Sequence, residues 1–137
     1  MKKFPFITLN DSLVLLRVMM AIVFLAHAIV RIFNGTIPRF GGYLESKGFI
    51  MGNPIVYAIT TFEIVGGVML AFGYFTRWLA LGFIILLIIG IGIIHAAEGW
   101  FVGEHGSGGM EYSVALIVSL IVVAATPRSP KGEVSAD

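Results

Sequence analysis

Cysteine is absent from this chain of 137 residues, and charged residues are scarce. The lack of cysteine excludes disulfides, thiolate metal ligands and thiol–disulfide exchange, so a redox role would require a bound cofactor. Charged residues make up 12% of the chain, whereas soluble domains contain roughly a quarter. The formal net charge of +1 is too small to attract nucleic acid or acidic substrates through a general electrostatic field.

Hydrophobic residues instead make up 58% of the chain and gather in four runs, over residues 12–33, 54–73, 78–97 and 110–126. Each run can cross about 30 Å of hydrocarbon at roughly 1.5 Å per residue, although the fourth is short and must cross steeply. Backbone groups cannot stay unpaired in lipid, so the runs predict helices. We expect an all-α integral membrane four-helix bundle, with one domain over residues 1–126 and a polar tail over residues 127–137.

Basic residues in the connections predict the orientation, because cytoplasmic loops carry an excess of Lys and Arg. The connection over residues 98–111 has three acidic residues and no Lys or Arg, which is typical of the outer face. We therefore expect a multi-pass protein of the cell inner membrane with both termini cytoplasmic. The basic residues on the expected inner side are Lys2, Lys3, Arg77, Arg128 and Lys131, and those on the other side are Arg31, Arg39 and Lys47.

The connection over residues 34–54 is too long for a simple turn. Phe40, Tyr43 and Lys47 recur in it at helical spacing, Pro38 suits a first helical turn, and Gly48 suits the residue after a last one. These features predict an interfacial helix whose aromatic side chains lie at headgroup depth. An ordinary surface loop is the alternative.

Two ionisable residues, Arg17 and Glu63, lie deep in the first and second runs. Such side chains cost at least about 2.5 kcal/mol each at hydrocarbon depth, so they normally face the bundle interior with partners. The depths of the two residues differ by no more than an Arg side chain can bridge. We predict an ion pair between them, which either belongs to a functional site or only locks two helices together.

A second group of ionisable residues is expected in the outer half of the bundle. His27 and Arg31 lie roughly 40° apart on one face of the first helix, at about 100° per residue. The third helix brings His95 and Glu98 to a similar depth, and Glu111 opens the fourth helix there. The five residues predict either a binding site or a polar lid.

Each member of this group also has a simpler interpretation. Arg31, Glu98 and Glu111 lie near helix ends, where charged side chains commonly reach the headgroups. His27 lies well inside the apolar run, and a buried His is usually only a hydrogen-bonded core residue. Its match in depth with His95 adds a ligand or proton-relay role as an alternative to that interpretation.

Glycines lie close to the predicted ion pair and along the third run. Gly66 and Gly67 follow Glu63 by one turn and would let another backbone, or a flat ligand, approach closely. The third run contains Gly82, Gly90 and Gly92. Close helix packing is the expected reason for all of them.

The segments LLRVMMAIVFLAHAIVRIF (15–33), FEIVGGVMLAFGYFTRWLAL (62–81), HAAEGWF (95–101) and MEYSVAL (110–116) resemble the DoxX family of small four-helix membrane proteins. The resemblance covers nearly the whole chain. Many members have Gly and Lys where this chain has Ala28 and Arg31, and a glycine-rich C-terminal end where it has a polar tail. The family's motif residues correspond here to Arg17, His27, Glu63, Gly66, Gly67, Arg77, His95 and Glu111.

The resemblance leaves the reaction open, because some relatives are subunits of quinone-reducing or quinol-oxidising complexes, others belong to oxidative-stress assemblies, and many have no known activity. Our first hypothesis is a membrane subunit or accessory protein that binds a quinone-like molecule in the outer half of the bundle. His27 and His95 would hydrogen-bond the quinone oxygens, and Glu98 or Glu111 would exchange protons with the outside.

The second hypothesis is a non-enzymatic membrane scaffold or small-molecule carrier whose polar cluster only fixes the bundle. Besides the lipid bilayer, its partners would be other membrane proteins or further copies of the chain, and not nucleic acid. A haem between His27 and His95 is a third possibility with weaker support, and no metal site is expected. Whether the protein is an enzyme stays open at this stage.

Overall fold

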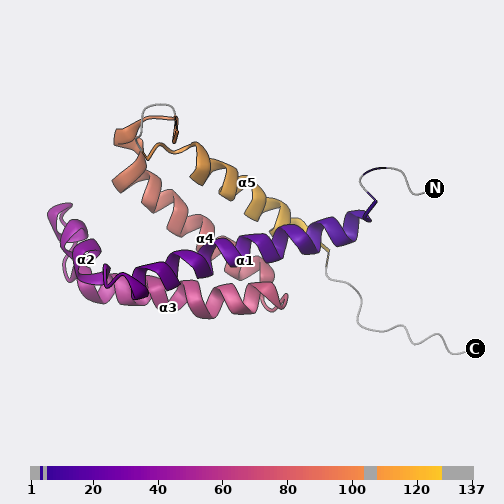
Figure 1. The fold of residues 1–137 in the computed structure, drawn as a ribbon, viewed down its shortest axis with the longest axis horizontal. Helices are drawn as coiled ribbons and strands as arrows, with labels where there is room; N and C mark the ends of the chain where they lie inside the picture. The colour runs from indigo at the N-terminus through magenta and orange to yellow at the C-terminus, as the bar shows by residue number, and fades with distance from the viewer. Residues whose placement is uncertain (1–3, 5, 104–107, 128–137) are drawn as a thin grey trace, which may run out of the picture.

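The apolar runs form helices in the computed structural model, which describes residues 4, 6–103 and 108–127 (Figure 1). Among these residues α1 covers Leu9–Phe33, α2 Ile37–Ser46, α3 Gly52–Ala71, α4 Thr76–Gly90 and α5 Glu111–Ala125. Two short segments continue α4, the π-helical η1 (Ile91–His95) and the 3₁₀-helical η2 (Ala96–Glu98). The predicted all-α class is confirmed.

Three of these helical segments are long and apolar enough to cross a membrane: Leu9–Phe33, Gly52–Ala71 and Thr76–Glu98. The fourth, α5, is apolar but has only 15 residues. A membrane protein is therefore supported, and the fourth crossing remains a prediction. The polar tail lies outside the described residues apart from Pro127, as do four of the basic residues used to predict the orientation.

The first helix begins at a capping box, three residues earlier than the sequence predicted. The side-chain oxygen of Thr8 accepts a hydrogen bond from the backbone N–H of Asp11 at 3.1 Å, while the Thr8 N–H donates to the Asp11 carboxylate. This reciprocal arrangement satisfies N–H groups that a helix start otherwise leaves unpaired. The carboxylate also lies at the positive end of the helix dipole.

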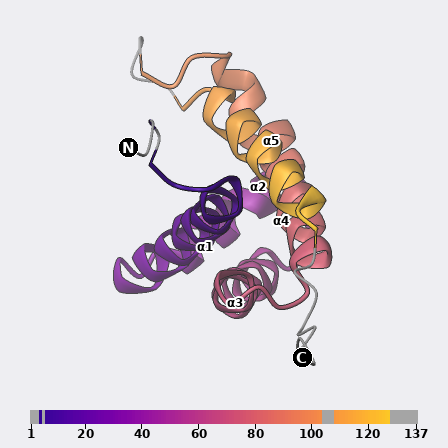
Figure 2. The ribbon, with the colours of Figure 1, turned by 90° about the vertical axis from the view of Figure 1, so that its right-hand side faces the viewer.

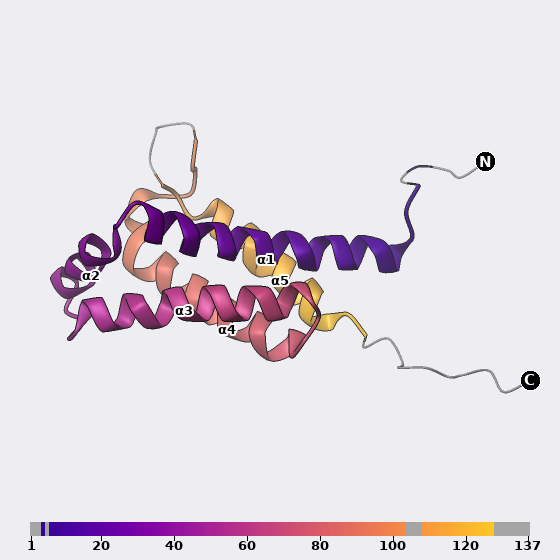
Figure 3. The same cartoon turned by 60° about the horizontal axis from the view of Figure 1, so that its bottom comes forward.

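The helices pack as two pairs. The first pair is α1 with α3, which lie side by side along most of their length (Figure 3), and the second is α4 with α5. Seen end-on, the second pair leans away from the first (Figure 2). The pairs meet at a buried apolar cluster in which the ring of Phe24 stacks on that of Phe83, with 3.9 Å between centroids.

Gly67 explains how α1 and α3 come so close. A Cβ atom at this position would lie 2.8 Å from Cγ of Leu25 and 3.5 Å from the carbonyl oxygen of Ala21 on α1. The neighbouring Gly66 gives the ring of Phe83 similar room. Both glycines therefore serve close packing, as the sequence predicted, and the side chains of α1 and α4 already occupy the space of a flat ligand there.

A short helix, α2, does occupy the connection between the first two runs. It lies across one end of the α1–α3 pair (Figure 3) and buries Ile37 and Leu44 against Val56 of α3. The carboxylate of Glu45 accepts a hydrogen bond from the backbone N–H of Gly52 at 2.9 Å, which caps the start of α3. These contacts fix α2 against α3, and its placement at the membrane surface remains a prediction.

Candidate functional site

A charged network joins α1 to α3 in the half of the molecule near α2. Nη1 of Arg31 lies 2.6 Å from a carboxylate oxygen of Glu63 and donates to the hydroxyl of Thr60 at 2.8 Å. The exposed fractions of the Arg31 and Glu63 side chains are 14% and 6%. The Thr60 hydroxyl in turn donates to the carbonyl oxygen of Val56 at 2.7 Å. A nearly buried ion pair thus joins α1 to α3, and Nη1 of Arg31 is shared between Glu63 and Thr60.

This network replaces the predicted pair of Arg17 with Glu63. Arg17 lies beside the other end of α3, where its Nη2 donates to the carbonyl oxygen of Ala71 at 3.5 Å. The Cα–Cβ bonds of a helix tilt toward its N-terminus. Arg31 therefore reaches back along α1 toward Glu63, whereas Arg17 reaches away from it. The prediction considered the depth of the residues but not the direction of their side chains.

An aromatic residue of α2 covers the network. The guanidinium carbon of Arg31 lies 5.4 Å from the ring centroid of Phe40, within cation–π range. Phe40 also packs against the buried cluster of Ile37, Leu44 and Val56. The position of α2 is thus coupled to the ion pair through this ring.

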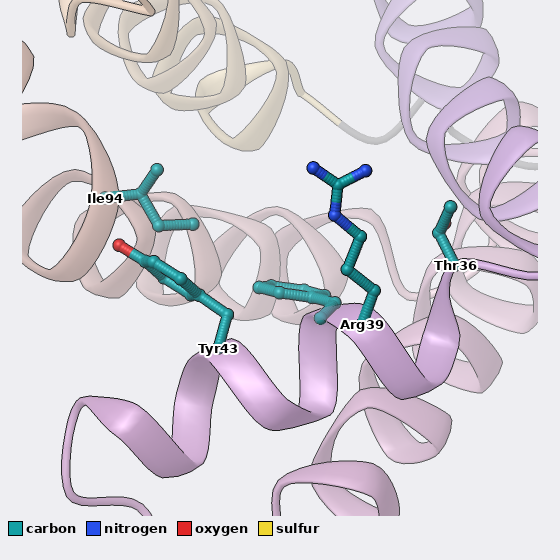
Figure 4. A pocket seen from close by; sticks show the side chains of 5 residues that line it. Thr36, Arg39, Tyr43 and Ile94 are labelled. Carbon is teal, nitrogen blue, oxygen red and sulfur yellow. The ribbon is translucent and has the colours of Figure 1, made fainter.

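A pocket of about 360 Å³ opens between α2 and η1. It is an open groove rather than a closed cavity, and Figure 4 shows the side chains of Arg39 and Tyr43 projecting from α2 toward the side where Ile94 lies. The Tyr43 hydroxyl donates to the carbonyl oxygen of Ile93 at 2.9 Å, which holds the two walls together. The lining residues are Thr36, Arg39, Phe40, Tyr43 and Ile94.

The wall contributed by η1 is a π-helical turn, a feature that is rare and frequent at functional sites. Such a turn disturbs the regular hydrogen-bond ladder, and here the Ile93 carbonyl accepts from Tyr43. Gly90 and Gly92 flank its start, and a Cβ atom at either would meet no atom of the neighbouring described segments within 4 Å. The expectation that close packing explains these two glycines was wrong, whereas Gly82 does pack, against the ring of Phe62.

A family model described as DoxX matches residues 12–96. The chain belongs to the DoxX family. The matched range runs from α1 to the first residue of η2, so it contains the ion pair and the groove. No curated protein and no solved structure matches the chain.

In this DoxX protein, two of the predicted site residues fasten the connection between η1 and α5. Nδ1 of His95 lies 2.6 Å from the carbonyl oxygen of Gly108, and the Glu111 carboxylate accepts from the backbone N–H of Val102 at 3.0 Å. Both interactions are with backbone atoms of the connection. The structure thus gives these side chains a local structural role, and ligand binding by them stays a prediction.

The other predicted site residues do not converge in one pocket of the DoxX chain. His27 is exposed and makes no hydrogen bond with any described residue, and Glu98 is exposed at the end of η2. His27 lies on the face of α1 that carries Met20, two turns earlier. Met20 is buried, so the helices that cover this face at Met20 do not reach His27. No group of three or more metal-binding side chains occurs within the described ranges.

Sequence reasoning missed Thr60 and the position of Arg39 in the groove of this DoxX protein. Thr60 precedes Glu63 by three residues, so both lie on one helix face, and this spacing was a usable signal. No comparable signal marked the groove, because its walls are far apart in the sequence and meet only through the fold.

Proposed function

We propose that this DoxX-family protein is a membrane subunit or accessory protein of a quinone-linked redox system. The quinone-like molecule binds in the groove between α2 and η1. The observation that carries the proposal is the pairing of an aromatic wall, Phe40 and Tyr43, with the guanidinium of Arg39 in one groove. Its volume of about 360 Å³ lies within the usual range of roughly 300–1,000 Å³ for small-molecule sites.

The chemistry of the groove suits a flat ring with carbonyl oxygens. An aromatic side chain offers its face to the ring, and the Arg39 guanidinium donates hydrogen bonds to a carbonyl oxygen. The Tyr43 hydroxyl already donates to Ile93, so its ring and not its hydroxyl contacts the ligand. Because the groove is open, an apolar tail can leave it toward lipid.

The absence of cysteine supports a subunit or accessory role rather than a self-contained oxidoreductase. Reduction of a quinone needs an electron donor, and the chain has no thiol to serve as one. A partner protein would supply the electrons. The residues of this chain bind and orient the ring.

The first test measures the affinity of the purified protein for decylubiquinone, a short-tailed quinone, in mild detergent. We expect Arg39→Gln to weaken binding by about tenfold or more, because a hydrogen bond from a charged donor contributes about 1.5–3 kcal/mol. Arg77→Gln is the matched control, since it removes the same guanidinium charge from an exposed residue in the first turn of α4, away from the groove. Equal affinities of the wild type and Arg39→Gln would contradict the proposal.

A non-enzymatic membrane scaffold or carrier is the second candidate, and the exposed His27 favours it. An ionisable residue within an apolar span normally faces other protein rather than lipid. Mass spectrometry of the protein purified in mild detergent separates the two candidates. A copurifying quinone supports the redox role, whereas copurifying membrane proteins without any quinone support the scaffold.

The proposed localisation is the cell inner membrane with both termini on the cytoplasmic side. A single cysteine introduced as Ser135→Cys is expected to react with a membrane-impermeant maleimide only after the cells are permeabilised. The cysteine-free sequence makes this labelling specific. Labelling in intact cells at the level seen after permeabilisation would reverse the orientation.

A further inference from the structure

Arg17 lies beside the C-terminal end of α3, at the end of the α1–α3 pair opposite α2. Figure 3 shows this end of α3 beside the first half of α1. A Cβ atom at Gly73 would lie 2.9 Å from Nη1 of Arg17, and φ of Gly73 is +81°. Gly73 thus adopts the positive φ that the turn requires, and its lack of a side chain leaves space for the guanidinium. The turn that ends α3 is shaped around this side chain.

The guanidinium is poorly paired in this position. An Arg side chain has five N–H donors, and the described residues accept one hydrogen bond from Arg17, at the Ala71 carbonyl oxygen. Its Nε is buried without a partner. The sequence predicted Glu63 as the partner of Arg17, but Glu63 pairs with Arg31. Within the described part of the chain, Arg17 is therefore a cation without a carboxylate.

The surroundings of Arg17 indicate the depth at which it lies. The turn from α3 to α4 and the first turn of α4 expose four large aromatic side chains, among them a Tyr and a Trp, the residue types enriched at the membrane–water interface. Phosphate groups of lipids lie at this depth. The exposed aromatic residues are Phe72, Tyr74, Phe75 and Trp78.

We propose that Arg17 binds the phosphate of an anionic lipid headgroup at the α3–α4 turn. The guanidinium fork matches the oxygen atoms of a phosphate and can donate two parallel hydrogen bonds to it. The carbonyl groups at the end of α3 hold the cation in place through the negative end of the helix dipole. Because Arg17 is only partly buried, a headgroup reaches it from the membrane surface. This site is independent of the groove and of quinone binding.

The test uses the full-length protein with Trp100→Phe, so that Trp78 beside the turn is the remaining tryptophan. Quenching of Trp78 is titrated with brominated phosphatidylglycerol and brominated phosphatidylcholine in mixed micelles. We expect the anionic lipid to bind about fivefold more tightly, the factor that corresponds to about 1 kcal/mol for one basic residue at an anionic lipid surface. Arg17→Gln should abolish this preference, and Arg17→Lys should retain part of it.

Lys47→Gln is the matched control, because it removes one positive charge at the opposite end of the α1–α3 pair and should leave the lipid preference unchanged. Competition by inorganic phosphate as strong as that by the lipid would overturn the lipid assignment in favour of a soluble phosphate site. Equal quenching of the wild-type turn by the two lipids would overturn the proposal even if Arg17→Gln fails to fold. An unchanged preference in a folded Arg17→Gln protein would do the same.

Discussion

Replacement of Glu63 by glutamine is expected to destabilise the protein by about 3–5 kcal/mol, because it leaves the charge of Arg31 nearly buried without a counter-ion. The two groups are 2.6 Å apart, and the amide oxygen of a glutamine can accept from the guanidinium but carries no negative charge. The free energy of unfolding can be measured by titration with a denaturing detergent in mixed micelles. The single replacement Arg31→Met should cost a similar amount for the same reason.

The double variant Arg31→Met with Glu63→Met provides the control, because it removes both charges and should be milder than either single variant. A second cycle with Arg17 and Glu63 distinguishes the observed pair from the one that the sequence predicted. Since these two side chains do not contact each other, their effects should add to within about 0.5 kcal/mol. A large coupling between Arg17 and Glu63, with none between Arg31 and Glu63, would contradict the structure.

The second large effect is expected for Phe83→Ala, at the contact between the two helix pairs. Phe83 is fully buried, stacks on Phe24 and lies 4.7 Å from the ring centroid of Phe62. We expect a loss of about 3 kcal/mol, the lower end of the range for Phe→Ala, because lipid is itself apolar and the lost packing accounts for most of the cost. The same denaturation assay measures it.

Phe33→Ala is the matched control, because the Phe33 side chain is 86% exposed and contributes little packing within the chain. Its effect should stay within about 0.5 kcal/mol, as for other surface substitutions. Equal stability of Phe83→Ala and Phe33→Ala would contradict the claim that the stacked rings of Phe24 and Phe83 stabilise the contact between the two helix pairs. In Phe83→Ala, a weaker contact between the two helix pairs should also be visible as faster proteolysis in detergent.

The all-α class could be predicted from the sequence because apolar runs, glycine and proline determine where individual helices form. The helix before α3, for example, followed from Pro38 and from the spacing of Phe40 and Tyr43. The family resemblance, carried by motifs in all four runs, was confirmed by the match over residues 12–96. These signals need no knowledge of how distant segments pack.

The site was harder to predict because it depends on direction and on tertiary contacts. Depth alone could not choose between Arg17 and Arg31 as the partner of Glu63, whereas side-chain tilt decides the choice. Equal depth also suggested that His27 meets His95, but the helix pairs diverge, so His27 is exposed. The two lateral walls of the groove come from α2 and η1, about fifty residues apart in the sequence, as the 50-residue separation of Tyr43 and Ile93 illustrates.

The ion pair between α1 and α3 also has a consequence for biosynthesis. Arg31 and Glu63 belong to consecutive apolar segments, so their partnership is available as soon as the second segment leaves the ribosome. Insertion of each segment alone would expose a charge to hydrocarbon, whereas insertion as a hairpin neutralises both together. The remaining helices then join a membrane-embedded hairpin in which Arg31 and Glu63 are already paired.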